Sequence, residues 1–443
     1  MFYMKKYVVI FWALLLTASL VYAQDNTSEK KSFTLEECLQ YAETHNFSLQ
    51  SGVIDDYIAD VNLRQAKENI APSVSASASQ GFNFGNYEKS VGWNGNYGIN
   101  AGMTLFNGLS NANKIKQSQL NVEQSKLYVE SSTNSVRISV IQAFLSIMMN
   151  EEILGYQQQV LTASQEQMEQ GKQQLDVGQI LESDYKMLQA QYTSDLYNIE
   201  NTRHTIESNY LTLKNLLSID PSIQITIVPP DSATLFKNLE LPELQDFMNK
   251  STNYLPELKI SENEVTSAEY DIKIQKAGYY PTLSASAGIS TGYNGSNLTS
   301  PNTGWGTQLW HGLGENIGLS LNIPIYQRGS VRNSVKLAEY RAQQVELQNK
   351  ETIYKVNQEL QQIYLDVTKS QNNFISAEAK KDAYLANYKT YSLRFKYGSV
   401  TAVDLIQQQT NFLNQLNLFM QAKYSYVLER KILDVYMGIP VTL

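Results

Sequence analysis

Hydrophobic and polar residues follow two different periods along this chain. From about residue 110 to 177, apolar residues recur at spacings of three and four, which is typical of a helix with one long apolar seam. The same spacing runs from Ile353 to Phe395. At roughly 1.5 Å per residue, a helix of this kind reaches about 100 Å. It needs a partner helix along its whole length, so a compact domain cannot contain it.

A glycine and a second helical pattern follow each long helix. The glycines are Gly178 and Gly398, and a glycine just past a helix end commonly adopts the left-handed conformation that stops the helix. The pattern therefore predicts two long helical hairpins, at about 109–219 with its tip at 178 and at about 330–437 with its tip at 398. Shorter helical patterns lie at about 33–68 and 242–277.

Four other segments alternate with a period of two, apolar on one face and Ser, Gly or Asn on the other. Each has about the length of a tilted transmembrane strand. Pro72 and Pro281 stand at the strand starts of the two pairs. A soluble hairpin pair covering a core is the alternative, but the long helices leave no core nearby. The predicted strands are residues 73–84, 97–106, 282–293 and 316–326, joined by loops at 85–96 and 294–315.

A membrane location for these strands has a consequence for assembly. An open sheet edge cannot lie in hydrocarbon, and bacterial barrels start at about eight strands. Four strands per chain therefore require at least two chains. Two chains would give a filled interior, whereas three would leave room for an open lumen.

The sequence contains two copies of one unit. Ala71–Ala78 recurs as Tyr280–Ala287, and in each copy an aspartate, Asp184 or Asp404, follows the tip glycine six residues later. Ordered landmarks of this kind indicate an internal duplication. We expect a first structural repeat at 24–220, an inter-repeat linker at 221–241 and a second structural repeat at 242–443.

The N-terminus carries an export pattern. Lys5 and Lys6 precede a short apolar run, and Val21-Tyr22-Ala23 resembles a cleavage site. The apolar run is shorter than the ~20 residues that span a bilayer. We therefore expect a signal peptide at 1–23, cleaved after Ala23, rather than a membrane anchor.

Composition narrows the function classes. The 443 residues include one cysteine and three histidines, which leaves little for disulfides or for zinc. The net charge of −8 argues against nucleic acid as a partner. No nucleophile elbow, phosphate-binding loop or HExxH motif is present. We therefore expect no catalytic residues, no cofactor and no metal site.

The ordered set of motifs resembles the TolC-like outer membrane efflux protein (outer membrane factor) family. The resemblance rests on the tip segments Leu175–Asp184 and Phe395–Leu405 and on the strand ends Leu105–Gly108 and Ile323–Gly329, and it covers about residues 33–440. It implies a mainly α fold with a transmembrane β-barrel, built from a duplicated helix–β-hairpin–long helical hairpin unit. It further implies a homotrimer with a 12-stranded barrel in the outer membrane of a Gram-negative bacterium and a 12-helix periplasmic tunnel.

The function implied by the resemblance is that of an exit channel. Such a channel conducts substrates of a tripartite efflux or type I secretion system, together with a periplasmic adaptor protein and an inner-membrane transporter. A soluble periplasmic coiled-coil adaptor or structural protein is the alternative. That class would share the helical seams, but it has no need of four alternating strands.

The resemblance also implies a gate at the helical tips. Asp184 and Asp404 match the tip aspartates of the family, which would place six carboxylates near the constriction of a trimer. Such a ring would tune opening, cation block and the response to pH. Thr401-x-x-Asp404 reads equally well as a helix capping box, and for Asp184 a capping role is slightly favoured.

Two positions depart from the family pattern. Gln407 stands where some members carry a second tip acid, and Val400 where some carry a base. Closure by salt bridges is therefore disfavoured, and closure by packing is the alternative. Phe395 and Tyr397 are the candidates for that packing.

Overall fold

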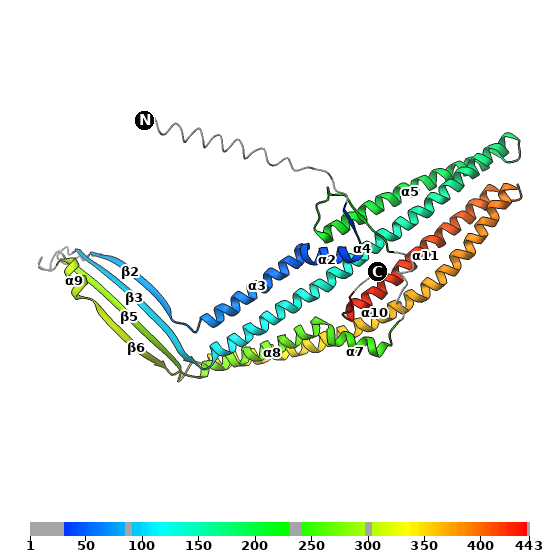
Figure 1. Cartoon of the computed structure of the whole chain (residues 1–443). Helices are drawn as coiled ribbons and strands as arrows, with labels where there is room; N and C mark the ends of the chain where they lie inside the picture. Colours follow the sequence, from blue (N-terminus) through cyan, green and yellow to red (C-terminus); the bar gives the residue numbers. More distant parts are fainter. Residues whose placement is uncertain (1–30, 85–90, 231–240, 297–303, 441–443) are drawn as a thin grey trace, which may run out of the picture.

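The protein is an elongated bundle of long helices with a β-sheet at one end and two helical tips at the other (Figure 1). The computed structural model describes residues 31–84, 91–230, 241–296 and 304–440. The predicted signal peptide, residues 1–23, lies outside this part of the chain.

The described part of the first repeat contains four helices and two long strands. The helices are α2 (Leu35–His45), α3 (Phe47–Glu68), α4 (Ser110–Asp176) and α5 (Glu182–Leu217), and the strands are β2 (Ser73–Phe84) and β3 (Val91–Asn107).

The second repeat follows the same plan. Its elements are α7 (Leu244–Tyr254), α8 (Pro256–Lys276), the short 3-10 turn η2 (Ala277–Tyr279), β5 (Thr282–Ser296), α9 (Trp305–His311), β6 (Gly314–Asn322), α10 (Ser330–Lys396) and α11 (Ala402–Tyr436).

Each leading helical segment is divided into two helices. Asn46 separates α2 from α3, and its side chain accepts hydrogen bonds from the backbone N–H groups of Ser48 at 2.9 Å and Leu49 at 3.2 Å. An asparagine cap of this kind starts a new helix. In the second repeat Pro256 occupies the first position of α8, where its missing N–H costs nothing.

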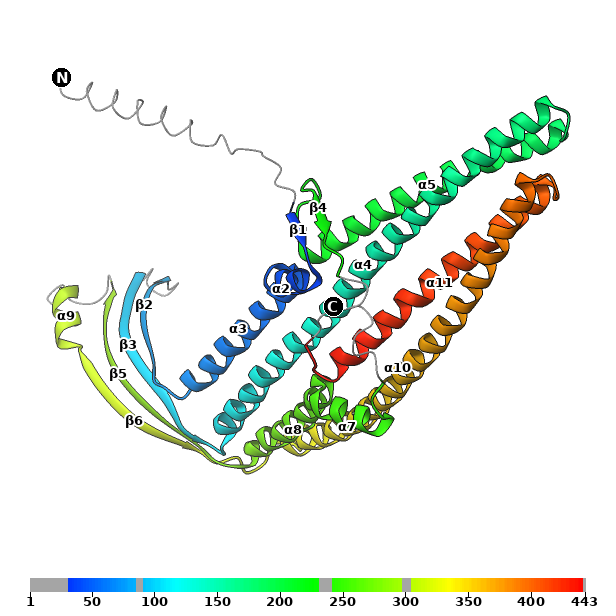
Figure 2. The ribbon, with the colours of Figure 1, turned by 45° about the vertical axis from the view of Figure 1, so that its right-hand side comes forward.

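The long helices form two antiparallel hairpins that lie side by side (Figure 2). α4 and α10 each have 67 residues, α5 has 36 and α11 has 35. α11 packs against both α4 and α5, so the second hairpin rests on the first.

The four long strands form one antiparallel sheet in the order β2-β3-β5-β6. The central pair, β3 with β5, joins the two repeats. The register aligns the apolar positions of all four strands on one face, as in the row Val74–Ala101–Ala287–Ile317. The neighbouring row on the other face is Ser75–Asn100–Gly288–Asn316.

Three of the four long strands have limits that differ from those predicted. β3 starts at Val91 rather than at 97, because its Asn- and Gly-rich start pairs through the backbone with β2 on one side and β5 on the other. β5 extends to Ser296 rather than ending at 293 for the same reason. β6 spans Gly314–Asn322 instead of 316–326, and Pro324, which has no N–H to donate to a ladder, follows its end.

Two predicted connections carry structure of their own. The segment 294–315, expected to be a loop, contains α9, which packs against β5. The predicted linker 221–241 contains β4 (Ile225–Ile227), which pairs in parallel with β1 (Lys31–Phe33). Strands of three residues carry no usable periodicity, so the sequence did not indicate this pair.

The core lies where the two repeats meet, around the middle of α4. An 18-residue stretch of α4 is apolar enough and long enough to cross a membrane, but 44% of it is buried within the chain. Its apolar side chains pack with those of α5 and α11, so this stretch is the core of the helical region. The buried residues include Val140, Phe144, Ile147, Leu213, Leu217, Leu416, Met420 and Val427.

Candidate functional site

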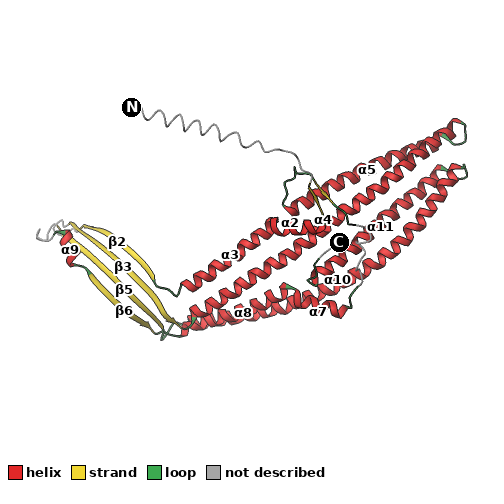
Figure 3. Cartoon of the chain, in the orientation of Figure 1, coloured by secondary structure: helices red, strands yellow, loops and turns green. Residues whose placement is uncertain are grey.

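The two hairpin tips have the same backbone geometry. Gly178 has φ of 76° and Gly398 has φ of 68°, so both turns depend on the left-handed conformation that glycine adopts readily. The Gly178 N–H donates to the Leu175 carbonyl and the Gly398 N–H to the Phe395 carbonyl, both at 2.9 Å. Figure 3 shows the two turns together at the end of the molecule opposite the sheet.

Asp404 forms a capping box with Thr401 at the start of α11. The Asp404 N–H donates to the Thr401 hydroxyl at 3.2 Å, and the Thr401 N–H donates to the Asp404 carboxylate at 3.1 Å. The Thr401 hydroxyl also donates to this carboxylate, at 2.7 Å. These bonds hold the pKa of the exposed Asp404 carboxyl below its usual value. The capping box predicted for Thr401 and Asp404 is therefore present in the structure.

Asp184 has a different environment from Asp404. The residue before α5 is Leu181, which has no side-chain acceptor, and no side-chain cap forms there. No capping box therefore forms at the start of α5, and the slightly favoured capping role of Asp184 stays a prediction. Its half-buried carboxylate still lies in the first turn of α5, where a negative charge is favourable to the helix dipole.

The structure separates the other tip candidates. Phe395 is 1% exposed and belongs to the core, whereas Tyr397 is 81% exposed. Of these two residues, Phe395 is the one whose side chain packs within a single chain. Gln407 lies on the exposed side of α11 and donates to the Asn411 side chain at 3.2 Å.

Glutamines of α4 connect the first hairpin to the second near the tips. Gln170 donates to the Lys396 carbonyl at 3.1 Å, and Gln167 donates to the Tyr388 hydroxyl at 3.1 Å. The Tyr388 ring stacks on Phe412 with 5.7 Å between ring centroids. No sequence pattern indicates these contacts, because exposed glutamines are common on helices and a buried one has no distinct spacing.

A buried polar cluster lies further from the tips, between the two hairpins. Asp195 of α5 accepts hydrogen bonds from Ser164 of α4, from Gln191 at 2.9 Å and from Gln409 of α11 at 2.9 Å. Gln409 also donates to the Ser164 hydroxyl at 2.9 Å. The helical seam predicts Ser164 at an inward position, but the pairing of Asp195 with Gln409 is a long-range contact.

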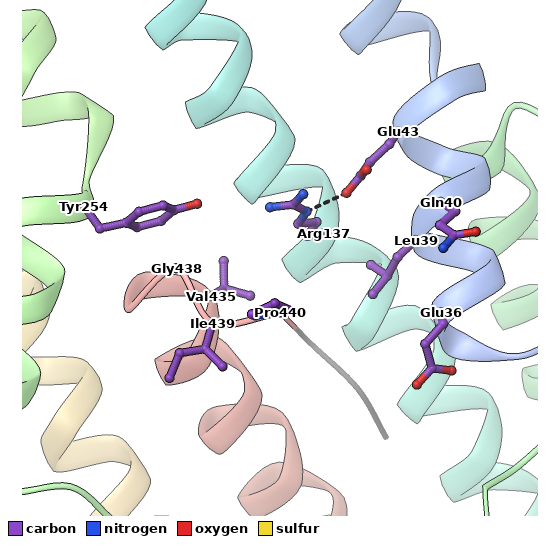
Figure 4. Close-up of a pocket in the computed structure, with 10 residues that line it drawn as sticks. All are labelled: Glu36, Leu39, Gln40, Glu43, Arg137, Tyr254, Val435, Gly438, Ile439 and Pro440. Carbon is purple, nitrogen blue, oxygen red and sulfur yellow. Dashed lines mark hydrogen bonds and ion pairs between the residues drawn. The ribbon is translucent and has the colours of Figure 1, made fainter.

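A pocket of about 410 Å³ lies where helices of the two repeats end, among α2, α4, α7 and α11 (Figure 4). Arg137 and Glu43 form an ion pair of 2.7 Å at its wall, and the Tyr254 ring points toward them. Within the described part of the chain, no three His, Cys, Asp or Glu side chains are grouped to hold a metal ion. Burial raises the pKa of Cys38 to about 12, so this thiol stays protonated.

The prolines at the strand starts lie where the chain turns from helix to sheet. Pro72 immediately precedes β2, and Pro281 immediately precedes β5. A proline just outside a strand leaves every ladder hydrogen bond intact.

This arrangement of sheet and hairpins is the fold of outer-membrane channels. The chain matches the outer-membrane channel OprN with a TM-score of 0.75 at 15% identity, over 91% of this chain and 89% of that one. It matches the outer membrane channel CmeC of Campylobacter jejuni with a TM-score of 0.74 at 18% identity, over 91% of this chain and 85% of that one. The predicted fold class is confirmed.

Sequence comparison finds similarity to outer membrane efflux proteins. Residues 250–438 match the profile of the family "Outer membrane efflux protein". Outer membrane protein TolC of Escherichia coli (strain K12) is 27% identical over 260 residues, which cover 54% of this chain. The match spans 50% of that relative's length. These matches confirm the resemblance to the TolC-like outer membrane efflux proteins that the motifs predicted.

Proposed function

We propose that this protein is the outer-membrane exit channel of a tripartite efflux or type I secretion system. Three copies form a 12-stranded barrel in the outer membrane of a Gram-negative bacterium and a 12-helix tunnel through the periplasm. Substrates arrive from an inner-membrane transporter by way of a periplasmic adaptor protein. The match of residues 250–438 to the outer membrane efflux protein family and the similarity to TolC support this role.

The observation that carries the proposal is the open sheet. β2 and β6 each have one partner strand in the described part of the chain, so each presents an unpaired backbone edge. The apolar face is uncovered as well, and on β6 the exposed fractions are 91% for Ile317, 72% for Leu319 and 61% for Leu321. In lipid such a face is favourable, and pairing β2 of one copy with β6 of the next removes both edges.

Exposed apolar side chains on the helices support the same assembly. Several lie on α3, where the described residues of one chain leave them exposed, and a large exposed apolar patch marks an interaction surface. Neighbouring copies of the chain would cover them in a closed tunnel. The exposed apolar residues of α3 include Val53, Ile54, Tyr57, Ile58 and Val61.

We propose that the tips form the closing constriction of the tunnel and that the protein has no enzymatic activity. Asp184, Asp404, Tyr397 and Gln407 would then face the lumen or neighbouring copies, while Phe395 holds the two hairpins of one copy together. Substitution Asp404→Ala tests the gate in planar bilayers. If neither conductance nor its block by cations changes, Asp404 acts only as a helix cap.

Assembly distinguishes this proposal from the alternative of a soluble periplasmic coiled-coil protein. We expect the mature protein to require detergent for extraction and to sediment as a trimer. Pairs of cysteines can be placed on β2 and β6, for example Ser77→Cys on β2 with Ser320→Cys, or a nearby β6 position, on β6. Because the two strands lie at opposite edges of one sheet, these pairs should form disulfides only between copies. Recovery as a monomer without detergent would refute the channel.

A further inference from the structure

Asp195 is a buried carboxylate without a cation. It is 3% exposed and lies on α5, about three helical turns beyond Asp184. None of the ion pairs in the described part of the chain involves it. Its hydrogen-bond donors are the neutral side chains of Ser164, Gln191 and Gln409.

This carboxylate lies at the contact between the two hairpins. Ser164 and Gln191 belong to the first hairpin, but Gln409 belongs to α11 of the second. Gln409 is fully buried, and its Oε1 atom has no hydrogen-bond partner among the described residues. The contact therefore holds both a charge without a counter-charge and an unpaired acceptor.

Such a contact is costly compared with the same groups in water. A buried ionised carboxylate loses hydration that neutral donors only partly replace, and a buried unpaired carbonyl loses its hydrogen bond to water. If α11 moves away from α5, water reaches both groups. Ionised Asp195 therefore disfavours the packed arrangement, although hydrogen bonds satisfy its oxygens.

We propose that Asp195 is a positioning residue that biases the two hairpins toward separation when ionised and toward packing when neutral. The proposal rests on the proposed channel function, in which separation of the hairpins opens the tip end of the tunnel. The opposite assignment is a clamp, in which charge-assisted hydrogen bonds from Gln409 and Ser164 hold the hairpins together. The two assignments predict opposite signs for loss of the charge.

The direction of the pKa agrees with the proposed sign. Burial raises the pKa of Asp195 above its usual value, and its three hydrogen bonds only partly offset this. An acid whose pKa is higher in the packed state stabilises that state at low pH and destabilises it as the pH rises through the raised pKa. Packing should therefore weaken on going from acidic to neutral pH.

The groups around Asp195 leave this titration nearly isolated. Among the described titratable groups, Tyr388 of α10 has a pKa that the charge of Asp195 affects. The pKa of Tyr388 is raised, so this residue stays neutral from acidic to neutral pH. The charged residues nearest in sequence on the packed helices, Glu166 on α4 and Lys389 on α10, are exposed. The facing turns of α11, from Leu405 to Gln421, contain no charged residue.

The test measures hairpin separation directly in the full-length trimer in detergent. Spin labels are attached at the exposed tip positions Gln179→Cys and Ser399→Cys, and their distance distribution is recorded at pH 5 and pH 8; the buried Cys38 stays unlabelled. In the parent protein the separated fraction should rise about fivefold or more from pH 5 to pH 8. Asp195→Asn, which keeps the shape, should hold it at the pH 5 level throughout.

A matched control and a second variant complete the test. Glu207→Gln removes an exposed charge from the same helix and should leave the pH response unchanged. Gln409→Glu places a second carboxylate against Asp195 and should increase separation at pH 8 more than at pH 5, because like charges repel. Where Asp195→Asn lowers trimer yield, the pH dependence of the parent protein still gives the sign, because a clamp would separate less, not more, as Asp195 ionises.

Two results would overturn the proposal. Greater separation in Asp195→Asn than in the parent would establish a clamp, and an unchanged pH response in that variant would show that Asp195 does not act on the contact. Neither result bears on whether the protein is a channel, which is decided by trimer formation and by conductance of the parent protein. Failure of the two proposals is therefore distinguishable.

Discussion

Thr401 and Asp404 show how far single residues can be interpreted from the sequence. Their spacing predicts a capping box, and every hydrogen bond of that box is present. Asp184 has the same place in its repeat, but Leu181 precedes it where Thr401 precedes Asp404, so no cap forms. The chemistry of the neighbour three residues earlier decides between the two, and that neighbour is visible in the sequence.

Removal of the cap should loosen the start of α11. Thr401→Ala deletes the acceptor for the Asp404 N–H, and loss of such a cap costs about 1 kcal/mol. Hydrogen exchange at the amides of residues 402–405 should become several times faster. Thr410→Ala, an exposed change in the middle of the same helix, is the control and should leave these amides unaffected.

Two glycines with positive φ should differ in their tolerance of alanine. A Cβ on Gly178 would point into open space, so Gly178→Ala adds only the backbone strain of about 1 kcal/mol. A Cβ on Gly108 would lie 2.6 Å from the Ala277 carbonyl oxygen, so Gly108→Ala adds a clash with η2, the turn that follows α8. Thermal unfolding should show the larger loss for Gly108→Ala, and equal losses would contradict this interpretation.

At the scale of elements, periodicity indicated the long helices and strands well because each has one face against a partner. Periodicity did not indicate segments that are held by backbone hydrogen bonds or are too short to show a period. The start of β3 from Val91 pairs through Gly and Asn residues, and α9 is too short for a helical period to stand out. The strand pairing β3–β5 was also outside the reach of local patterns, since it joins the two repeats.

Packing between the hairpins should depend on Phe395 and not on Tyr397. Phe395→Ala removes a fully buried ring, a change that typically costs about 3–5 kcal/mol. Denaturant unfolding of the trimer should shift strongly for this variant. Tyr397→Ala, two residues further on and largely exposed, is its control. Equal shifts would show that Phe395 does not anchor the tip of α10.

The two faces of β5 should respond oppositely to a charge. Ile289 lies on the apolar face with Ile99, whereas Ser290 lies on the Gly- and Ser-rich face with Gly98. A lysine on the lipid face of a barrel costs about 2–4 kcal/mol near the midplane, and one on the lumen face costs little. Ile289→Lys should therefore reduce heat-stable trimer in gels, and Ser290→Lys should not. The reverse order would place the lipid on the other face.

At the scale of the whole molecule, the duplication accounts for the plan of the chain, and long-range contacts account for what the sequence did not reveal. Asp195 and Gln409 are 214 residues apart, and neither residue has a spacing that marks it as buried. The parallel pairing of β1 with β4, which connects residues 31–33 to the segment between the repeats, is also a long-range contact that no local pattern indicates. Only the folded chain brings these residues together.

The equal length of α4 and α10, 67 residues each, also restricts how the protein can change in evolution. A seven-residue insertion keeps the apolar seam in phase but lengthens its helix by about 10 Å. If the insertion occurred in one repeat alone, the tip of that repeat would extend beyond the other tip. The six tips of the proposed trimer would then alternate in height. We therefore expect insertions and deletions in these helices to be matched between the two repeats, so that the two halves of the chain lengthen or shorten together.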